Sequence, residues 1–511
     1  MRKTKALYGE EARLALQAGI NQVYNAVAPT MGARGRNVIY KKYGMPIVTN
    51  DGVSIAREII PEDPYEYLGA EALKQASEQT NDEAGDGTSQ TIVLGKHAID
   101  NGFLAIEQGI NPMILRREIE IGKDKIVEAL KELAIPVEDL KEVAQISVED
   151  KDLAKMVADL VQEVGVDGSI LVEESPGTNV RTEIVKGYTW NRGYVSPYMI
   201  TNEKGEAVLE NCAVLVTDRY MNLNTDLFGL MQSLVSKGIS SLMVVADNAE
   251  GELLQTIIAN KQKGIINVVV AKKPETKEEL EDLAILTGGI AVTSEKDIKQ
   301  INDTHVGFAE RVVVSREKTI IVNTKTEDTI KVRVDEIREQ IKAEDQEKYG
   351  QIEILKRRLS RLVGGVARIK VGANTEAEQA YLKMKIDDAV GACRSALEEG
   401  IVPGGGTTLR DLVTILDEEI PGELVLINTI IQPYLTILKN AGIEITSEDI
   451  SGNYNVLTGE LVEDMMAEGI VDPAKVVRCA LQNAVSIATM VLTTETAIAD
   501  IPDEPKIVVQ G

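Results

Sequence analysis

The chain of 511 residues is 44% hydrophobic and 27% charged, a composition that is ordinary for a soluble protein with about two to four domains. Its formal net charge of −26 argues against nucleic acid or an anionic membrane as the main partner. Three scattered cysteines and two histidines exclude a Cys/His zinc site, and with no apolar signal or membrane-spanning segment evident we expect a cytoplasmic location.

The first 135 residues are predicted to be mostly helical, interrupted by one hairpin with strands over 38–40 and 46–49. Apolar spacing over 92–99 predicts a helix that follows a glycine turn and ends near 101–102. Residues 140–165 are predicted to be helical and strongly charged.

The pattern changes near residue 169, where short β-branched runs begin to alternate with amphipathic stretches. This alternation is typical of βαβ units with some parallel pairing. A hairpin and one long charged helix over 335–362 follow. Strands are predicted at 169–172, 213–216, 242–245, 268–270, 312–314 and 320–322, and amphipathic helices at 225–237 and 251–263.

Gly364-Gly365 is predicted to end the long helix, and the chain is again helical over 375–399 and on to about 495, with an irregular stretch at 448–460. Helical material therefore flanks a central α/β block on both sides. This is the plan of one domain inserted within another.

The run Gly85-Asp86-Gly87-Thr88-Ser89 places a carboxylate inside a glycine turn directly before a predicted helix. Backbone N–H groups of such a turn and the helix N-terminus attract an anion, which Asp86 would repel unless a cation lay between them. Mg²⁺ bound to a nucleotide phosphate satisfies both groups. The structural alternative is a capped helix start with Asp or Thr as the N-cap.

Other acidic or glycine-rich turns occur in both helical arms, at Asn50-Asp51-Gly52, Asp387-Asp388, Gly404-Gly405-Gly406 and Asp472-Pro473. The last of these has the pattern of an N-cap followed by proline at the start of a helix. No Walker A lysine motif and no GxGxxG after a strand are present. If the arms pack together, the turns could form a phosphate cradle with Mg²⁺ and a spare carboxylate to orient water. Each turn taken singly is equally compatible with a structural role.

The order and the amino-acid sequences of five segments resemble the ATP-site signatures of the chaperonins. The resemblance is closest to the GroEL-type, group I chaperonins. It runs essentially from end to end of the chain. The segments are Thr30–Asn37, Thr49–Val53, Asn81–Thr88, Glu398–Gly406 and Gly469–Val476.

The resemblance implies a multidomain α and α/β fold with a discontinuous, mostly helical equatorial ATP domain over 1–134 and 399–511. A small intermediate hinge domain is expected over 135–187 and 365–398, and an inserted α/β apical domain over 188–364. Gly187 with Gly364-Gly365 would form the upper hinge, and the segments near 135 and 399 the lower one.

The resemblance also implies roles for individual residues. Asp86 would hold Mg²⁺, Asp388 would polarise the attacking water, and Asp51 would lie beside the γ-phosphate. Asp472 and Asn455 would meet the ribose and adenine end. The implied nucleotide-binding set is Thr30, Met31, Gly32, Asp86, Gly87, Thr88, Ser89, Gln90, Gly405, Asn455 and Asp472.

Three departures from the family pattern concern the same site. Asn50 stands where a lysine is usual, at the contact with a monovalent cation, so K⁺ is left open as a second cation. Gln90 replaces the usual third hydroxyl residue after Gly-Asp-Gly. The segment between Gly442 and Asn455 is abbreviated, and the glycine- and methionine-rich tail is absent.

Each of the amphipathic stretches 225–237 and 251–263 carries more apolar residues than one buried stripe needs. They are compatible either with core packing alone or with an exposed, methionine-containing groove for unfolded chains. The resemblance selects the groove, with Tyr194, Tyr198, Met199, Phe228, Met231, Leu254 and Ile258 as its positions.

The implied function is an ATP-dependent chaperonin ATPase that captures non-native polypeptides and folds them in a homo-oligomeric ring, with seven as the expected number of subunits. The protruding insertion of group II chaperonins is not evident between Asp218 and Lys237, which leaves room for a separate GroES-like lid. The shortened segment 442–455 motivates the hypothesis of a single ring. The competing classes are a small-molecule ATP enzyme and a nucleotide-independent holdase.

Overall fold

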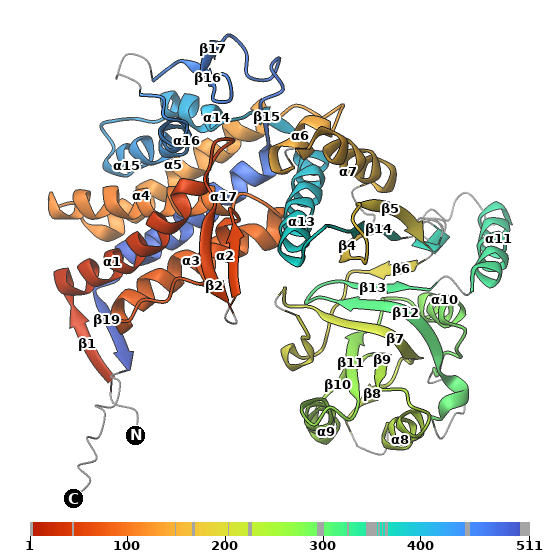
Figure 1. Cartoon of the computed structure of the whole chain (residues 1–511). Coiled ribbons are helices and arrows are strands. Elements are labelled where there is room, and N and C mark those ends of the chain that lie inside the picture. Colours follow the sequence, from red (N-terminus) through yellow and green to blue (C-terminus); the bar gives the residue numbers. More distant parts are fainter. Residues whose placement is uncertain are drawn as a thin grey trace, which may run out of the picture. The chain divides into compact units, whose positions relative to one another are not determined.

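In the computed structural model the chain divides into two compact units (Figure 1). Unit 1 comprises Met1–Val166, Val172–Arg181 and Lys370–Gly511, and unit 2 comprises Asp167–Leu171 and Thr182–Ile369. Within them, the described residues are 4–42, 45–148, 150–165, 169–185, 187–202, 204–222, 227–293, 301–323, 326–343, 355, 358–359, 361–362, 366–444 and 450–500.

Unit 1 is mainly helical, as predicted, and its N-terminal and C-terminal arms share one core (Figure 1). The apolar helix α17, Ala474–Leu492, packs on α3 and α4, so residues four hundred positions apart become neighbours. The other helices are α1 Gly9–Val27, α2 Gly52–Arg57, α3 Pro64–Ala84, α4 Thr88–Glu107, α5 Pro112–Leu133, α6 Lys141–Ser147, α7 Lys151–Val164, α13 Glu376–Glu399, α14 Thr407–Asp411, α15 Pro421–Ile430 and α16 Gln432–Ala441.

The predicted end of α4 near 101–102 is wrong, because the helix continues to Glu107. Gly102 does not end the helix but allows close packing. A Cβ at Gly102 would lie 2.4 Å from Cδ1 of Leu492 in α17, so a larger residue there would force the Leu492 side chain to move. Gly102 is thus explained by a tertiary contact that local sequence does not reveal.

Short two-stranded sheets complete unit 1. The predicted hairpin is confirmed as β2, Val38–Lys42, with β3, Met45–Thr49. Near the two ends of the chain, β1, Thr4–Tyr8, pairs antiparallel with β19, Thr496–Asp500. The remaining pairs are β15 Ile401–Pro403 with β18 Val471–Pro473 and β16 Asn453–Asn455 with β17 Glu460–Val462.

Unit 2 is built on a six-stranded sheet with the order β11-β9-β7-β12-β13-β6. β7, β9 and β11 are parallel, as the βαβ pattern predicts, whereas β12, β13 and β6 are antiparallel. The sheet strands are β6 Gly187–Trp190, β7 Ala207–Val216, β9 Ser241–Ala246, β11 Asn267–Lys272, β12 Gly307–Val314 and β13 Thr319–Val322.

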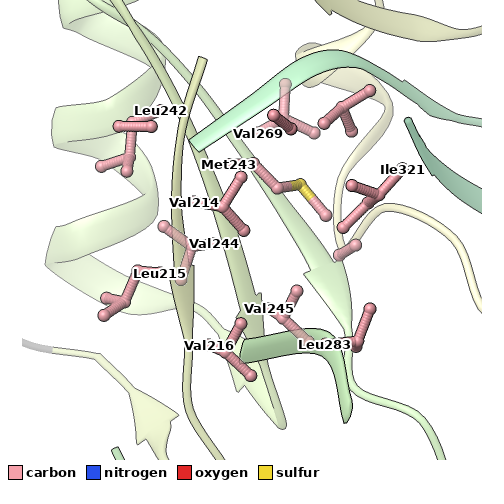
Figure 2. Packing of buried hydrophobic residues seen from close by; sticks show 14 of the residues in the cluster. Val214, Leu215, Val216, Leu242, Met243, Val244, Val245, Val269, Leu283 and Ile321 are labelled. Carbon is pink, nitrogen blue, oxygen red and sulfur yellow. The ribbon is translucent and has the colours of Figure 1, made fainter. Parts of the chain in front are cut away.

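The core of unit 2 lies where side chains from this sheet meet the helix α10, Lys277–Thr287 (Figure 2). Val214, Val244 and Val269 come from three adjacent parallel strands, and Leu283 of α10 and Ile321 of β13 pack in the same cluster. The aliphatic, aromatic-poor composition agrees with this core, which is built mainly from Val, Ile, Leu and Ala. The further helices are α8 Phe228–Ser236, α9 Gly251–Gln262 and α11 Glu327–Ala343.

In a short parallel pair, β8 Tyr220–Met221 lies beside β10 Asn248–Ala249; in the chain, β8 comes before α8 and β10 before α9. A further sheet has the order β4-β14-β5, and the boundaries between the two units fall within its strands β4 Ser169–Glu174, β14 Val366–Val371 and β5 Arg181–Val185. The three-domain division stays a prediction beside this two-unit division. Gly364-Gly365 and parts of the predicted helix 335–362 lie outside the described residues.

One helix among the described residues, Ala474–Leu492, is long and apolar enough to cross a membrane by length and composition, although no such segment is predicted from the sequence. Its most apolar window is 67% buried inside unit 1. That burial is typical of a core helix.

Candidate functional site: a carboxylate cluster at a glycine turn

Asp86 lies between two glycines that join α3 to α4. Gly85 ends α3 with φ of 72° and Gly87 begins α4 with φ of 88°, both in the left-handed region. No side chain caps α4, so the alternative of an Asp or Thr N-cap is wrong. The Asp86 carboxylate instead accepts hydrogen bonds from the Gly87 N–H at 2.6 Å and from the Ser147 hydroxyl at 3.3 Å.

Asp51 begins the next element of the site. Its carboxylate caps α2 by accepting from the N–H groups of Val53 at 3.3 Å and Ser54 at 2.9 Å. A Cβ at Gly52 would lie 2.8 Å from Oγ1 of Thr88 and 2.6 Å from Oγ of Ser89. The turn after β3 therefore presses against the first turn of α4, so the structure brings Asp51 to the glycine turn.

Helix α13 brings Asp388 to the same place. The sulfur of Met384 accepts hydrogen bonds from the hydroxyls of Ser54 at 3.5 Å and Thr49 at 3.8 Å, one on each side of Asp51. Farther along α13, a Cβ at Gly391 would lie 2.6 Å from the carbonyl oxygen of Gly85. Two contacts thus fix α13 against both turns.

Asp472 is positioned by backbone groups. Its carboxylate accepts hydrogen bonds from the N–H groups of Gly405 and Gly406. It does not cap α17, whose N-cap is Pro473, so the helix-start interpretation of Asp472-Pro473 is wrong in this respect. Pairing of β15 with β18 explains the arrangement, because it lays the 404–406 turn alongside Val471.

Burial and neighbouring carboxylates raise the pKa of Asp86, Asp388 and Asp472. Burial and the nearby Asp51 and Asp86 charges raise the pKa of Asp388 well above its usual value. Burial, with a smaller contribution from Asp51, raises the pKa of Asp86. Burial and the Asp86 charge raise the pKa of Asp472 to about 7. A cluster of acids that favours protonation is suited to binding a cation, which removes this cost.

Lys385 and Ser147 are functional candidates that sequence reasoning missed. The positive charge of Lys385 lowers the pKa of both Asp86 and Asp388, which opposes the effect of burial. Lys385 lies one turn before Asp388 on α13, and this i, i+3 spacing is the signal that could have indicated it.

The remaining nucleotide-site predictions differ in placement. Thr30 joins the site, since its hydroxyl lies 3.4 Å from that of Ser89. Met31 is buried beside Ala28 and Val93, and its backbone N–H and carbonyl are hydrogen-bonded to Ala28 and to the side-chain amide of Asn440. Gly32 has φ of 88° and packs on Ile437, and Gln90 is buried in the first turn of α4.

Asn455 is not linked to the carboxylate cluster by the contacts described here, since its amide oxygen accepts from the Leu457 N–H within the β16–β17 hairpin. Its position at the adenine end stays a prediction. Within the described ranges, no group of three or more His, Cys, Asp or Glu side chains could hold a metal ion. Mg²⁺ is commonly held by one or two carboxylates together with phosphate oxygens, so Asp86 fits it as part of a nucleotide complex.

The predicted groove positions in unit 2 divide into exposed and buried residues. Tyr198 is 72% exposed and Phe228 57% exposed, while Tyr194, Leu254 and Ile258 are half-buried. Met199 and Met231 are core residues with 1% and 5% exposure, so their assignment to an exposed groove is wrong in this conformation. The reason is geometric: Met231 lies on the inward face of α8 with Leu230 and Leu234, and the Met199 sulfur accepts from the Val270 N–H at 3.2 Å.

The fold and the site together define a class of protein. An α/β unit is inserted into a helical unit, and the helical unit carries a glycine turn at a helix N-terminus with a cluster of carboxylates. The chain belongs to the TCP-1/cpn60 chaperonin family, whose model matches residues 23–502. Membership of this family supports a chaperone role.

Solved structures give the same picture of the fold. The chain is similar to the chaperonin gp146 from the bacteriophage EL 2 (Pseudomonas aeruginosa) in two crystal forms, both in the presence of ATP-BeFx. Form II has 23% identity and a TM-score of 0.67, covering 98% of this chain and 99% of that one. Form I has 22% identity and a TM-score of 0.62 with the same coverage. The predicted GroEL-like multidomain fold is confirmed.

Proposed function

We propose that this protein is an ATP-dependent chaperonin that captures non-native polypeptides and promotes their folding in the cavity of a homo-oligomeric ring. Binding and hydrolysis of Mg²⁺·ATP would drive the cycle. The observation that carries the proposal is the convergence of Asp51, Asp86, Asp388 and Asp472 on one glycine turn at the start of a helix.

Each part of this site has a task in phosphate chemistry. Asp86 would hold Mg²⁺, while the hydroxyls of Thr88 and Ser89 and the uncapped N–H groups of α4 would bind phosphate oxygens. The metal, when bound, would neutralise charge on the phosphates. Asp388 would accept a hydrogen bond from the attacking water, with Asp51 beside it. No covalent intermediate is needed.

The docked position of α13 suggests how hydrolysis could be coupled to conformation. Asp388 is positioned by contacts of its own helix, at Met384 and Gly391. If α13 leaves this position, Asp388 leaves the site with it. A nucleotide that binds the docked state more tightly would therefore shift the population toward that state.

Capture would take place on the apolar residues of unit 2 that remain exposed. Tyr198 and Phe228 are open to solvent, and Leu254 and Ile258 are partly so. Apolar burial is non-directional, which suits the recognition of unfolded chains of any sequence. Covering these residues after ATP binding would release the client.

Several finer points belong to the same proposal. They are a cytoplasmic location, a ring of seven subunits, a separate GroES-like lid that docks on the same groove, and a K⁺ contact altered by Asn50. The group I assignment belongs with them.

The test is the ATPase rate of Asp388→Ala against Asp387→Ala, the adjacent carboxylate on the same helix. We expect Asp388→Ala to bind nucleotide nearly as well as the wild type and to lose most turnover, on the order of a hundredfold, because a water-orienting group is removed. Asp387→Ala should keep most of its activity. An unchanged rate in Asp388→Ala would contradict the assigned role. Stimulation by a metabolite, with no response to denatured protein, would favour a small-molecule enzyme.

A further inference from the structure

Tyr198 is the most exposed of the predicted capture residues, yet its backbone is firmly anchored. It belongs to the short turn η2, Pro197–Met199, whose next residue Met199 is buried with its sulfur on the Val270 N–H. The Val195 N–H also donates to the Val270 carbonyl at 3.0 Å. One side of the turn is thus fixed to β11.

Lys261 of α9 holds the other side. Its ammonium group donates to the carbonyl oxygens of Tyr198 at 3.1 Å and Ile200 at 2.6 Å. Partial burial lowers the pKa of Lys261, so this charge has given up part of its hydration for the two carbonyls. Hydrogen bonds from a charged donor are stronger than those between neutral groups.

The position of Lys261 along α9 connects this contact with the capture surface. Leu254, Ile258 and Lys261 have the spacing i, i+4 and i+7, which places them on one face of the helix. The methylene stem of Lys261 extends this apolar face, while its charged end bends onto η2. The Lys261 ammonium group thus ties the backbone of Tyr198 to the helix that carries Leu254 and Ile258.

We propose that Lys261 is a positioning residue for client capture: it fixes the exposed Tyr198 next to Leu254 and Ile258 so that the three side chains form one binding surface. The inference rests on the proposed chaperonin function. A fixed aromatic side chain loses less conformational entropy when it binds, so loosening the turn should weaken capture without touching the ATP site.

The test is a double-mutant cycle that measures the affinity of the nucleotide-free protein for a reduced, carboxymethylated and fluorescently labelled α-lactalbumin. We expect Lys261→Met, which keeps the stem but cannot donate, to weaken binding about tenfold, because the turn that carries Tyr198 loses its anchor on α9. Lys261→Arg, which keeps a charged donor, should bind the probe as the wild type does. Lys263→Met, an exposed neighbour just past α9, is the matched control and should bind as the wild type does.

The double-mutant cycle distinguishes two roles of Lys261: positioning Tyr198, or contacting the client directly. In the Tyr198→Ala background, Lys261→Met should cause little further loss. Equal losses in both backgrounds, or wild-type binding by Lys261→Met, would overturn the inference. Lys261→Gln replaces Lys261→Met in the cycle if the latter does not fold.

Two further measurements distinguish a failure of the inference about Lys261 from a failure of the proposed chaperonin function. The ATPase rate of Lys261→Met should equal that of the wild type, and a cooperative thermal transition of the variant shows that it is folded. If the wild type and Tyr198→Ala both fail to bind the unfolded probe, the proposed function fails, whatever the effect at Lys261.

Discussion

At the scale of single residues, the buried carboxylate of Asp472 lowers the stability of the nucleotide-free fold when it is ionised. Its pKa rises from 3.8 to about 7 through burial and the nearby Asp86 charge. The unfolded chain releases the Asp472 proton near pH 4, whereas the folded chain keeps it until about pH 7. Stability is therefore lost as the pH rises through this window, and the ionised carboxylate destabilises the nucleotide-free fold above it.

We predict that Asp472→Asn is more stable than the nucleotide-free wild type by about 2 kcal/mol at pH 8, a figure that allows for partial solvent screening. The amide oxygen can still accept from Gly405 and Gly406. The difference should shrink at pH 5, and urea unfolding at the two pH values measures it. Asp124→Asn, an exposed site on α5, is the control and should show no such trend. A difference of zero at both pH values would contradict the raised pKa.

At the scale of elements, the crossing of α13 over the turn between α3 and α4 decides where Asp388 lies. The backbones approach so closely that each of Gly85 and Gly391 excludes a Cβ at the other. Since Gly391 is in an ordinary helical position, its only special requirement is space.

We predict that Gly391→Ala retains nucleotide binding but lowers kcat about tenfold or more, because overpacking displaces α13 and with it Asp388. Steady-state kinetics should show the loss in kcat, with KM little changed. Gly229→Ala is the control, since its helical glycine has open space where the Cβ would stand. Full kcat in Gly391→Ala would show that the crossing does not position Asp388.

The local parts of this arrangement could be predicted from the sequence. The hairpin β2–β3, the glycine turn and the alternation of strands and helices in unit 2 all follow from turn chemistry and periodicity. Long-range contacts could not be predicted in this way. Gly102 and Gly391 look like ordinary helical glycines until Leu492 and Gly85 are placed against them.

The sequence also did not predict which apolar side chains of a helix face the solvent and which face the core. The excess of apolar residues in α8 was compatible with core packing alone or with partial exposure, and periodicity did not distinguish Phe228, which is exposed, from Met231, which is buried. The turns that hold the four carboxylates could be recognised from the residues, whereas the resemblance assigned the carboxylates their roles. Their mutual pKa effects required coordinates, as did the role of Lys385.

At the scale of the whole molecule, the number of rings depends on contacts between copies of the chain. The shortened segment 442–455 motivates the single-ring hypothesis, and its residues 445–449 lie outside the described part. We predict a single ring, which for seven subunits of 55.6 kDa has a mass of about 390 kDa. Native mass measurement with and without ATP tests this. A stable particle of about twice that mass in both conditions would refute it.

The central claim is that nucleotide controls the capture of non-native protein. The most direct measurement follows the fluorescence anisotropy of a labelled, unfolded protein mixed with the full-length chain, before and after addition of Mg²⁺·ATP. We predict capture without nucleotide and release on ATP binding. Phe228→Ser, with its exposed aromatic removed, should capture weakly while its ATPase persists. Capture that is unaffected by Mg²⁺·ATP would contradict the account and identify the protein as a nucleotide-independent holdase.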